Sequence, residues 1–337
     1  MNQLLCFTAA LCLILFNICV AGLVGVNYGM LGNNLPLPSE VIALLKSREI
    51  TRVRLFDPNH DALQALEGSG IDVILGTLNQ DLQNLGSDLS FARSWVQDNV
   101  IPYSEAVMFR CISAGNEAIP SDFAVHVLPA MRNLKAALVE ANLGEIPVST
   151  TVSTAVLGNS YPPSHGEFSN EASTIMKPII EFLAATKSPF LVNVYPYFAY
   201  INDQQDISLD YAMFNCSEVV VKDGQLGYMN LFDAIIDAVY SALEKAGGDS
   251  IVIVVSESGW PSKENGDIAT IANAQMYNNK LIAHVNGASG TPKRPGRSIE
   301  TYVFAIFNEN LKPPGTEQQF GLFYPNMTEV YHVEFTH

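Results

Sequence analysis

Two glutamates stand where apolar segments of the sequence end. Glu117 follows the run FRCISAGN, and Glu257 follows the apolar run of IVIVVS. A turn into a helix, a helix cap or a salt bridge could account for either carboxylate alone. Two converging carboxyl groups can cleave a glycosidic bond, because one protonates the leaving oxygen while the other attacks the anomeric carbon. Carboxyls about 5 Å apart suit retention of configuration, and about 6.5–9.5 Å suits inversion.

Aromatic and amide side chains lie at or near the ends of several apolar segments of the sequence. Aromatic rings can cover the apolar faces of sugar rings, while amides and carboxylates bind the sugar hydroxyls. Core packing is the alternative for each ring. The residues that we expect around a substrate are Tyr28, Asn116, Asn193, Tyr197, Trp260 and Phe307.

Charged residues also follow the last apolar segment, in FNENLK. Glu309 and Lys312 could form a local ion pair there, or a charge network that reaches Glu257. A cation close to Glu257 would keep that carboxylate ionised. Glu317 lies in the following loop and could assist from further away.

Other kinds of catalytic site lack their signatures in this sequence. The six histidines are scattered, and no H-E-x-x-H motif is present. No G-x-S-x-G motif surrounds a serine, and Ser258 lacks one of the glycines that it would need. We therefore expect no metal and no cofactor.

Eight short apolar segments alternate with longer amphipathic ones, and they must position these side chains. Seven of the longer segments are predicted to be helices: residues 36–48, 60–70, 91–100, 124–144, 175–186, 231–248 and 269–287. Many of the short segments are apolar on both faces, as strands of a covered parallel sheet are. The pattern predicts a single-domain (β/α)8 barrel; the alternative is an open doubly wound sheet, which usually carries a G-x-G-x-x-G turn that is absent here. Residues 201–227 are expected to form a small excursion after the sixth strand. The expected strands are residues 23–28, 51–56, 71–76, 108–114, 147–152, 190–195, 251–256 and 301–307.

The barrel brings the two glutamates together. Side chains at the carboxyl ends of barrel strands converge on one mouth. Glu117 ends the fourth strand and Glu257 ends the seventh, and these strands face each other across that mouth. The predicted fold therefore supports the paired-carboxylate hypothesis.

The N-terminal segment of the sequence indicates a secreted protein. Residues 1–21 are apolar and without charge, and we interpret them as a signal peptide followed by one domain at 22–337; a membrane anchor is the alternative. The net charge of −16 argues against nucleic acid and anionic lipid as partners. We expect the mature protein to be a monomer outside the membrane.

Two kinds of residue bear on covalent modification. The sequons at Asn215 and Asn326 are glycosylation candidates. Cys111 and Cys216 are expected to be free thiols rather than a disulfide.

Several motifs carry a family resemblance. The segments GVNYGMLGNNLP, AGNE, LVNVYPYFAY, VVSESGWPS and TYVFAIFNEN with FGLFYPN resemble plant β-1,3-glucanases of glycoside hydrolase family 17. The similarity covers essentially the whole chain after residue 21. VSESGWPS and VNYG are specific elements, whereas G-N-E alone is common.

The resemblance implies a (β/α)8 barrel that cleaves β-1,3-glucans such as callose internally and with retention. It implies that Glu117 is the general acid/base and Glu257 the nucleophile, and that Asn116 binds the sugar 2-hydroxyl. Tyr195 matches a tyrosine that contacts the nucleophile, and Glu309, Lys312 and Glu317 match supporting charged positions. The acidic extracellular members are the most similar in form, which implies the cell wall or apoplast.

Two further functions use the same scaffold. A β-1,3-glucan transglycosylase would need the same residues, with a sugar hydroxyl in place of water. A non-catalytic glucan-binding or defence protein would not need both Glu117 and Glu257, so their presence favours an enzyme.

Overall fold

Eight parallel strands close into one barrel in the computed structural model, which describes residues 22–335. The predicted signal peptide at 1–21 lies outside the described residues. The strand order around the barrel is β1-β14-β11-β8-β5-β4-β3-β2, which confirms all eight predicted strands and rules out the open sheet. The strands are β1 (Val24–Tyr28), β2 (Arg52–Leu55), β3 (Asp72–Gly76), β4 (Met108–Asn116), β5 (Val148–Ser153), β8 (Phe190–Asn193), β11 (Ile253–Ser258) and β14 (Thr301–Val303).

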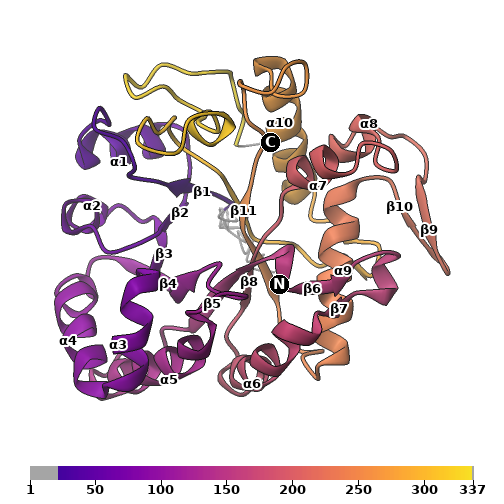
Figure 1. Ribbon diagram of the computed structural model, residues 1–337. Helices are drawn as coiled ribbons and strands as arrows, with labels where there is room; N and C mark the ends of the chain where they lie inside the picture. The colour runs from indigo at the N-terminus through magenta and orange to yellow at the C-terminus, as the bar shows by residue number, and fades with distance from the viewer. Residues whose placement is uncertain (1–21, 336–337) are drawn as a thin grey trace, which may run out of the picture.

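Helices surround the barrel and cover its outer face (Figure 1). Their apolar sides pack on the outward-facing strand residues, which explains why the strands are apolar on both faces. Seven of these helices coincide with predicted amphipathic segments. The helices of the ring are α1 (Pro38–Ser47), α2 (His60–Leu66), α3 (Leu82–Ser87), α4 (Leu89–Asn99), α5 (Ala124–Glu140), α6 (Asn170–Thr186), α9 (Leu231–Lys245) and α10 (Ile271–Asn286).

A separate cluster of buried side chains fills the barrel interior. It consists of Ile74, Cys111, Leu191, Val254 and Tyr302, which come from five different strands. Burial raises the pKa of the Cys111 thiol to about 12. Both cysteines of the described chain are free, as predicted, so Cys111 serves as a small apolar side chain.

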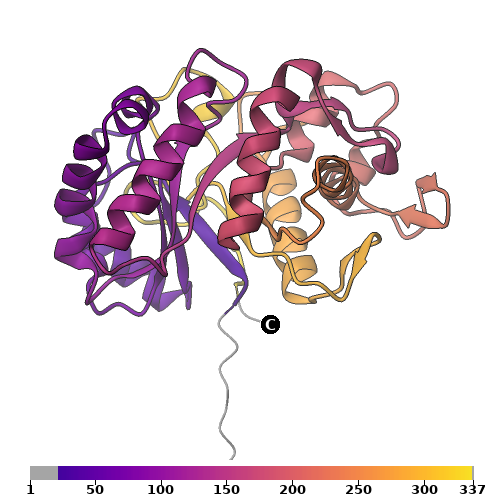
Figure 2. The same ribbon diagram turned by 90° about the horizontal axis from the view of Figure 1, so that it is seen from below.

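Three small additions extend the connections between strands. The excursion predicted after the sixth strand is present: α7 (Pro196–Asn202), α8 (Leu209–Ala212) and the hairpin of β9 (Val221–Asp223) and β10 (Leu226–Tyr228) stand out from one side of the barrel (Figures 1 and 2). Two hairpins were not predicted, because their strands are only two or three residues long. They are β6 (Leu157–Asn159) with β7 (Glu167–Phe168), and β12 (Gly290–Thr291) with β13 (Arg294–Pro295).

No helix within residues 22–335 combines the length and the apolar character that a membrane crossing requires.

Candidate active site

A cleft of about 650 Å³ opens at the carboxyl ends of the barrel strands. Its walls come from the segments that follow β1, β2, β3, β4, β11 and β14. This is the end at which catalytic groups of such barrels gather. Six of the side chains predicted from the sequence line it: Asn116, Glu117, Glu257, Glu309, Lys312 and Glu317.

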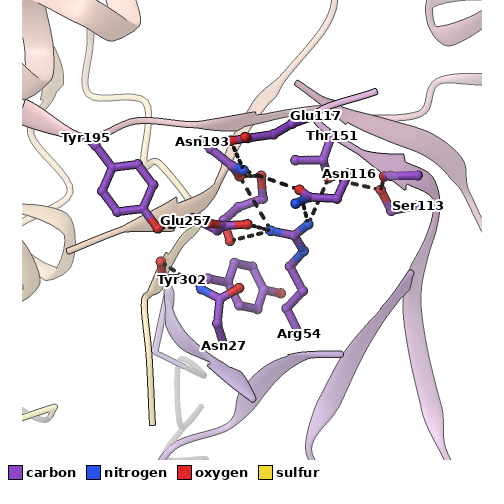
Figure 3. Close-up of polar contacts among 12 residues, drawn as sticks. Asn27, Arg54, Ser113, Asn116, Glu117, Thr151, Asn193, Tyr195, Glu257 and Tyr302 are labelled. Carbon is purple, nitrogen blue, oxygen red and sulfur yellow. Dashed lines mark hydrogen bonds and ion pairs between the residues drawn. The ribbon is translucent and has the colours of Figure 1, made fainter. Parts of the chain in front are cut away.

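A β-bulge aims Glu117 into this cleft. In a regular strand Asn116 and Glu117 would point to opposite faces. The register between β4 and β5 instead shifts between Ser113 and Asn116, and Gly115 has a φ of 76°. Glu117 itself has a φ of 51°, a left-handed conformation that costs a non-glycine residue about 1–2 kcal/mol. Asn116 and Glu117 therefore both face the mouth of the barrel (Figure 3).

A second irregularity presents Glu257. The register between β11 and β8 shifts between Val255 and Glu257, so the side chain enters the mouth from the opposite side. Glu257 is only 6% exposed. Its Oε1 lies 2.7 Å from Nη1 of Arg54, and its Oε2 accepts a hydrogen bond of 2.8 Å from the Tyr195 hydroxyl. The contact that the resemblance implied for Tyr195 is present.

Arg54 of β2 is the cation that contacts Glu257, and it was not among the residues predicted from the sequence. Its side chain is 1% exposed, and its guanidinium lies 4.6 Å from the ring centroid of Phe56. Besides binding Glu257, it donates to Asn116 Oδ1 at 2.8 Å and to the Ser256 carbonyl at 3.2 Å (Figure 3). One signal was available: an arginine inside the apolar strand RVRL requires a buried anion, because an unpaired buried charge is very costly.

Asn193 connects the two halves of the site. Its Nδ2 donates to Oε1 of Glu117 at 2.8 Å, and its Oδ1 accepts from Ser256 Oγ at 2.8 Å. Ser256 precedes Glu257 on β11. Asn193 Oδ1 also accepts a hydrogen bond of 3.4 Å from Arg54, which binds Glu257, so both glutamates belong to a single polar network at the bottom of the cleft.

The environment of Glu117 favours its protonated form. Burial raises the pKa of Glu117 above its ordinary value of 4.5, and the negative charge of Glu257 raises it further. The hydrogen bond from Asn193 and the charge of Arg54 oppose this rise without cancelling it. Within residues 22–335 no lysine, arginine or histidine lies within ion-pair distance of Glu117. Glu117 is therefore suited to hold a proton, whereas Glu257 lies against the positive charge of Arg54.

The charged residues after β14 form their own pair. Lys312 Nζ lies 3.1 Å from Glu309 Oε2, which confirms the predicted local ion pair. Glu309 Oε1 accepts a hydrogen bond of 2.8 Å from the backbone of Leu31, and Lys312 Nζ stands 4.0 Å from the ring centroid of Phe304. Of the two alternatives for this pair, the structure supports the local ion pair, and the cation that contacts Glu257 is Arg54.

Four predicted sugar-binding rings are buried. Tyr28, Tyr197, Trp260 and Phe307 are at most 3% exposed. Trp260 donates to the carbonyl of Ile268 at 2.8 Å, and its ring packs edge to face on Tyr197 with centroids 5.0 Å apart. Burial corrects the prediction that these rings contact the sugar: large apolar rings near the mouth are stabilised more by packing on one another than by facing the cleft.

Other rings occupy the cleft wall in their place. Phe56 and Phe304 both line it. The ring of Phe304 also packs edge to face on Tyr195, with centroids 6.2 Å apart. Tyr195 therefore stands between the aromatic wall and the Glu257 carboxylate.

The two sequons lie on the surface. Asn215 and Asn326 are both exposed. Asn326 Oδ1 accepts a hydrogen bond of 2.7 Å from Thr328 Oγ1, whereas Asn215 Nδ2 donates to Asp210 at 3.2 Å. Glycosylation of either residue stays a prediction.

The chain is similar to known proteins over nearly its whole length. Residues 24–335 match the family described as Glycosyl hydrolases family 17. A glucan endo-1,3-beta-glucosidase of Vitis vinifera is 53% identical over 93% of this chain and 92% of its own length. Lichenase-2 of Hordeum vulgare is 49% identical over 93% and 98%.

A solved structure agrees with these relatives. It belongs to a study of two plant beta-glucan endohydrolases with distinct substrate specificities, and it superposes with a TM-score of 0.89 and 49% identity. The match covers 92% of this chain and 100% of that one. The fold, the paired carboxylates and the match over nearly the whole chain lead to one conclusion: this chain belongs to glycosyl hydrolase family 17 and is a glycosyl hydrolase.

Proposed function

We propose that the protein is a secreted, retaining endo-β-1,3-glucanase that hydrolyses β-1,3-glucans of the callose and laminarin type. The substrate class is supported by the relative named glucan endo-1,3-beta-glucosidase, which this chain matches over most of both lengths. The open cleft along the barrel mouth suits attack within a long chain.

In the first step Glu257 attacks the anomeric carbon. A bond forms between a carboxylate oxygen of Glu257 and that carbon, while the bond to the glycosidic oxygen breaks. Glu117 donates its proton to this oxygen, so the leaving chain departs as an alcohol. The product is a covalent glucosyl ester of Glu257.

In the second step water completes the hydrolysis. Glu117, now ionised, takes a proton from water as the water oxygen attacks the anomeric carbon and the ester to Glu257 breaks. Esterified Glu257 carries no charge, so it no longer raises the pKa of Glu117, which favours the base form when a base is needed. The two displacements restore the β configuration.

One observation carries this assignment: the two glutamates share a cleft but differ in their partners. Glu257 is bound by Arg54 and Tyr195, which stabilise a carboxylate. Glu117 has a raised pKa with burial as the first cause. Asn116, which accepts a hydrogen bond of 2.8 Å from Arg54, is proposed to bind the sugar 2-hydroxyl beside the acid; its contact with Arg54 supports this role because it fixes the amide.

The test uses purified protein with laminarin as substrate. Reducing sugar should be released, and NMR should detect the β-anomer before mutarotation. Glu257→Ala should lose turnover, and azide should restore cleavage of an activated aryl laminaribioside with an α-glycosyl azide as product. Glu117→Ala with azide should instead give the β-glycosyl azide.

Other outcomes would separate the competing functions. Full activity of Glu257→Ala would overturn the nucleophile assignment. An initial α-anomer would overturn retention. Transfer products that exceed hydrolysis products at low laminarin concentration would identify a transglycosylase, and glucan binding without any cleavage would identify a non-catalytic protein.

Secretion to the cell wall or apoplast is part of the proposal. It is supported by the apolar leader at 1–21, for which cleavage after Ala21 is proposed. Expression in plant cells, followed by N-terminal sequencing of the protein in the wall fraction, tests both points. Sedimentation of the same material tests the proposed monomer, and mass spectrometry before and after glycosidase treatment tests Asn215 and Asn326.

A further inference from the structure

We infer that Asn79 is a positioning residue for the general acid: it holds the backbone turn that aims Glu117 at the glycosidic oxygen. The inference rests on the proposed role of Glu117. Asn79 begins a short 3-10 helix (Asn79–Asp81) that is separated from the end of β3 by two residues, and β3 is the barrel strand beside β4.

Both polar atoms of the Asn79 amide bind the backbone of one residue. Nδ2 donates to the carbonyl of Asn116 at 2.8 Å, and Oδ1 accepts from the amide of Asn116 at 2.8 Å. Asn116 immediately precedes the acid. A side-chain amide that pairs with both backbone groups of a residue replaces the ladder contacts that a neighbouring strand would make.

The turn that Asn79 grips is not one that the chain would adopt freely. Gly115 and Glu117 on either side of Asn116 have φ values of 76° and 51°. Left-handed conformations are unfavourable for a glutamate, so surrounding contacts must maintain this one. Thr77 adds a third contact, because its Oγ1 accepts from the Gly115 amide at 3.0 Å.

Close approach at this turn requires glycine. A Cβ on residue 115 would lie 2.9 Å from Asn79 Oδ1, which is closer than such atoms tolerate. The glycine and the asparagine are therefore matched: Gly115 leaves the space that the Asn79 amide uses.

The contact acts on the acid through the chain. The Asn116 carbonyl and the Glu117 amide belong to one peptide plane, so fixing that plane sets the direction of the Glu117 side chain. Two groups hold this plane: Asn79 binds its carbonyl oxygen, and the Glu117 amide donates to the Thr151 carbonyl at 2.9 Å. Asn193 contacts only the carboxyl end of Glu117, at 2.8 Å. Loss of Asn79 should let the turn relax and displace the acid, while Glu257 on the far side of the mouth keeps its own contacts with Arg54 and Tyr195.

The test compares two substrates that differ in their need for an acid. Laminarin has an alcohol leaving group that must be protonated, whereas a 2,4-dinitrophenyl β-laminaribioside releases a stable phenolate without help. The value of kcat/KM for each reports the glycosylation step. The variants are Asn79→Ala, Glu117→Gln as reference, and Asn84→Ala as control, because Asn84 is an exposed asparagine in α3 of the same segment.

We expect Asn79→Ala to lower kcat/KM on laminarin about 10- to 100-fold, which is part of the effect of a general acid. On the dinitrophenyl substrate its kcat/KM should stay within about 3-fold of the unchanged protein. Asn84→Ala should match the unchanged protein on both. The ratio of the two values in one preparation does not depend on the folded fraction, so partial misfolding of the variant leaves the test valid.

Equal loss on both substrates, or loss on neither, would overturn the inference. If Glu117→Gln shows the split between substrates and Asn79→Ala does not, the proposed function stands and the inference alone fails. If Glu117→Gln itself shows no split, Glu117 is not the acid, and the role of Asn79 falls with it.

Discussion

Arg54 Nη1 lies 2.7 Å from Oε1 of Glu257, and both side chains are almost fully buried. The two residues are far apart in the chain and meet only because β2 and β11 point into one barrel mouth. A buried carboxylate of this kind needs a partner, since burial alone disfavours the charged form. Arg54 therefore provides the buried positive charge that the carboxylate of the proposed nucleophile needs.

Arg54→Met should reduce both stability and activity. Removing one member of a buried ion pair costs roughly 3–5 kcal/mol of unfolding free energy, because the other charge is left without a partner. We expect kcat/KM on laminarin to fall about 100-fold or more. Arg54→Lys should recover little, since an ammonium cannot contact Glu257 and Asn116 at once as the planar guanidinium does.

Lys312→Met is the matched comparison for Arg54. A charge network that reaches Glu257 was one of the two roles considered for Lys312, but its partner is Glu309. Its loss should reduce activity less than the loss of Arg54. Urea unfolding and laminarin kinetics of the three variants check the prediction, and it is wrong if Lys312→Met proves more damaging than Arg54→Met.

The activity should persist above the ordinary pKa of a glutamate. The general acid must be protonated, and the pKa of Glu117 is raised by burial and by the charge of Glu257. The basic limb of kcat/KM should therefore lie above pH 4.5. Glu257→Gln removes the second cause, so the pKa of Glu117 should fall in that variant.

Carbon-13 NMR of labelled glutamate side chains can follow this titration directly. Glu117→Gln identifies the signal of Glu117 by its absence. An unchanged pKa of Glu117 in Glu257→Gln would show that the two carboxyls do not interact.

Asp237 should make the folded protein more stable in mild acid. This side chain of α9 is fully buried, and burial raises its pKa to about 6 although Thr291 and the Lys293 backbone donate to it. A raised pKa means that folding binds a proton. The contribution is complete below the ordinary value of 3.8 and is lost as pH rises through about 6.

Asp237→Asn removes this titration and keeps a side chain of the same shape. Between pH 4 and 7 the unchanged protein should lose on the order of 2 kcal/mol more unfolding free energy than Asp237→Asn. Urea unfolding of both proteins across this range measures the difference. Parallel curves would show that Asp237 does not titrate there.

Trp260 should contribute to stability rather than to substrate affinity. Its ring is fully buried and its indole nitrogen binds the Ile268 carbonyl at 2.8 Å. Trp260→Phe should cost about 1–3 kcal/mol of unfolding free energy, and KM for laminarin should change by less than about 3-fold. A large rise in KM with unchanged stability would instead place this ring in contact with the glucan.

The periodic sequence determined the barrel and the positions of its two reacting carboxyls. Each strand must be apolar on both faces to pack between the interior cluster and the helix ring, and this requirement appears as a local pattern. Glu117 and Glu257 interrupt two such patterns at the strand ends, where barrel residues face the mouth. Eight strands, the seven predicted helices and the cleft position of these glutamates were therefore predictable.

Only the tertiary structure decided which side chains meet and which are covered. Arg54 lies in a strand whose sequence does not reveal that Glu257, Asn116 and Ser256 surround it, because these contacts depend on barrel closure. The fate of Trp260 depends on neighbours supplied by distant segments. The turn at Glu117 is held by the Asn79 side chain, which comes from the segment after β3. Local patterns record whether a residue is apolar or polar, whereas partners and burial follow from packing in three dimensions.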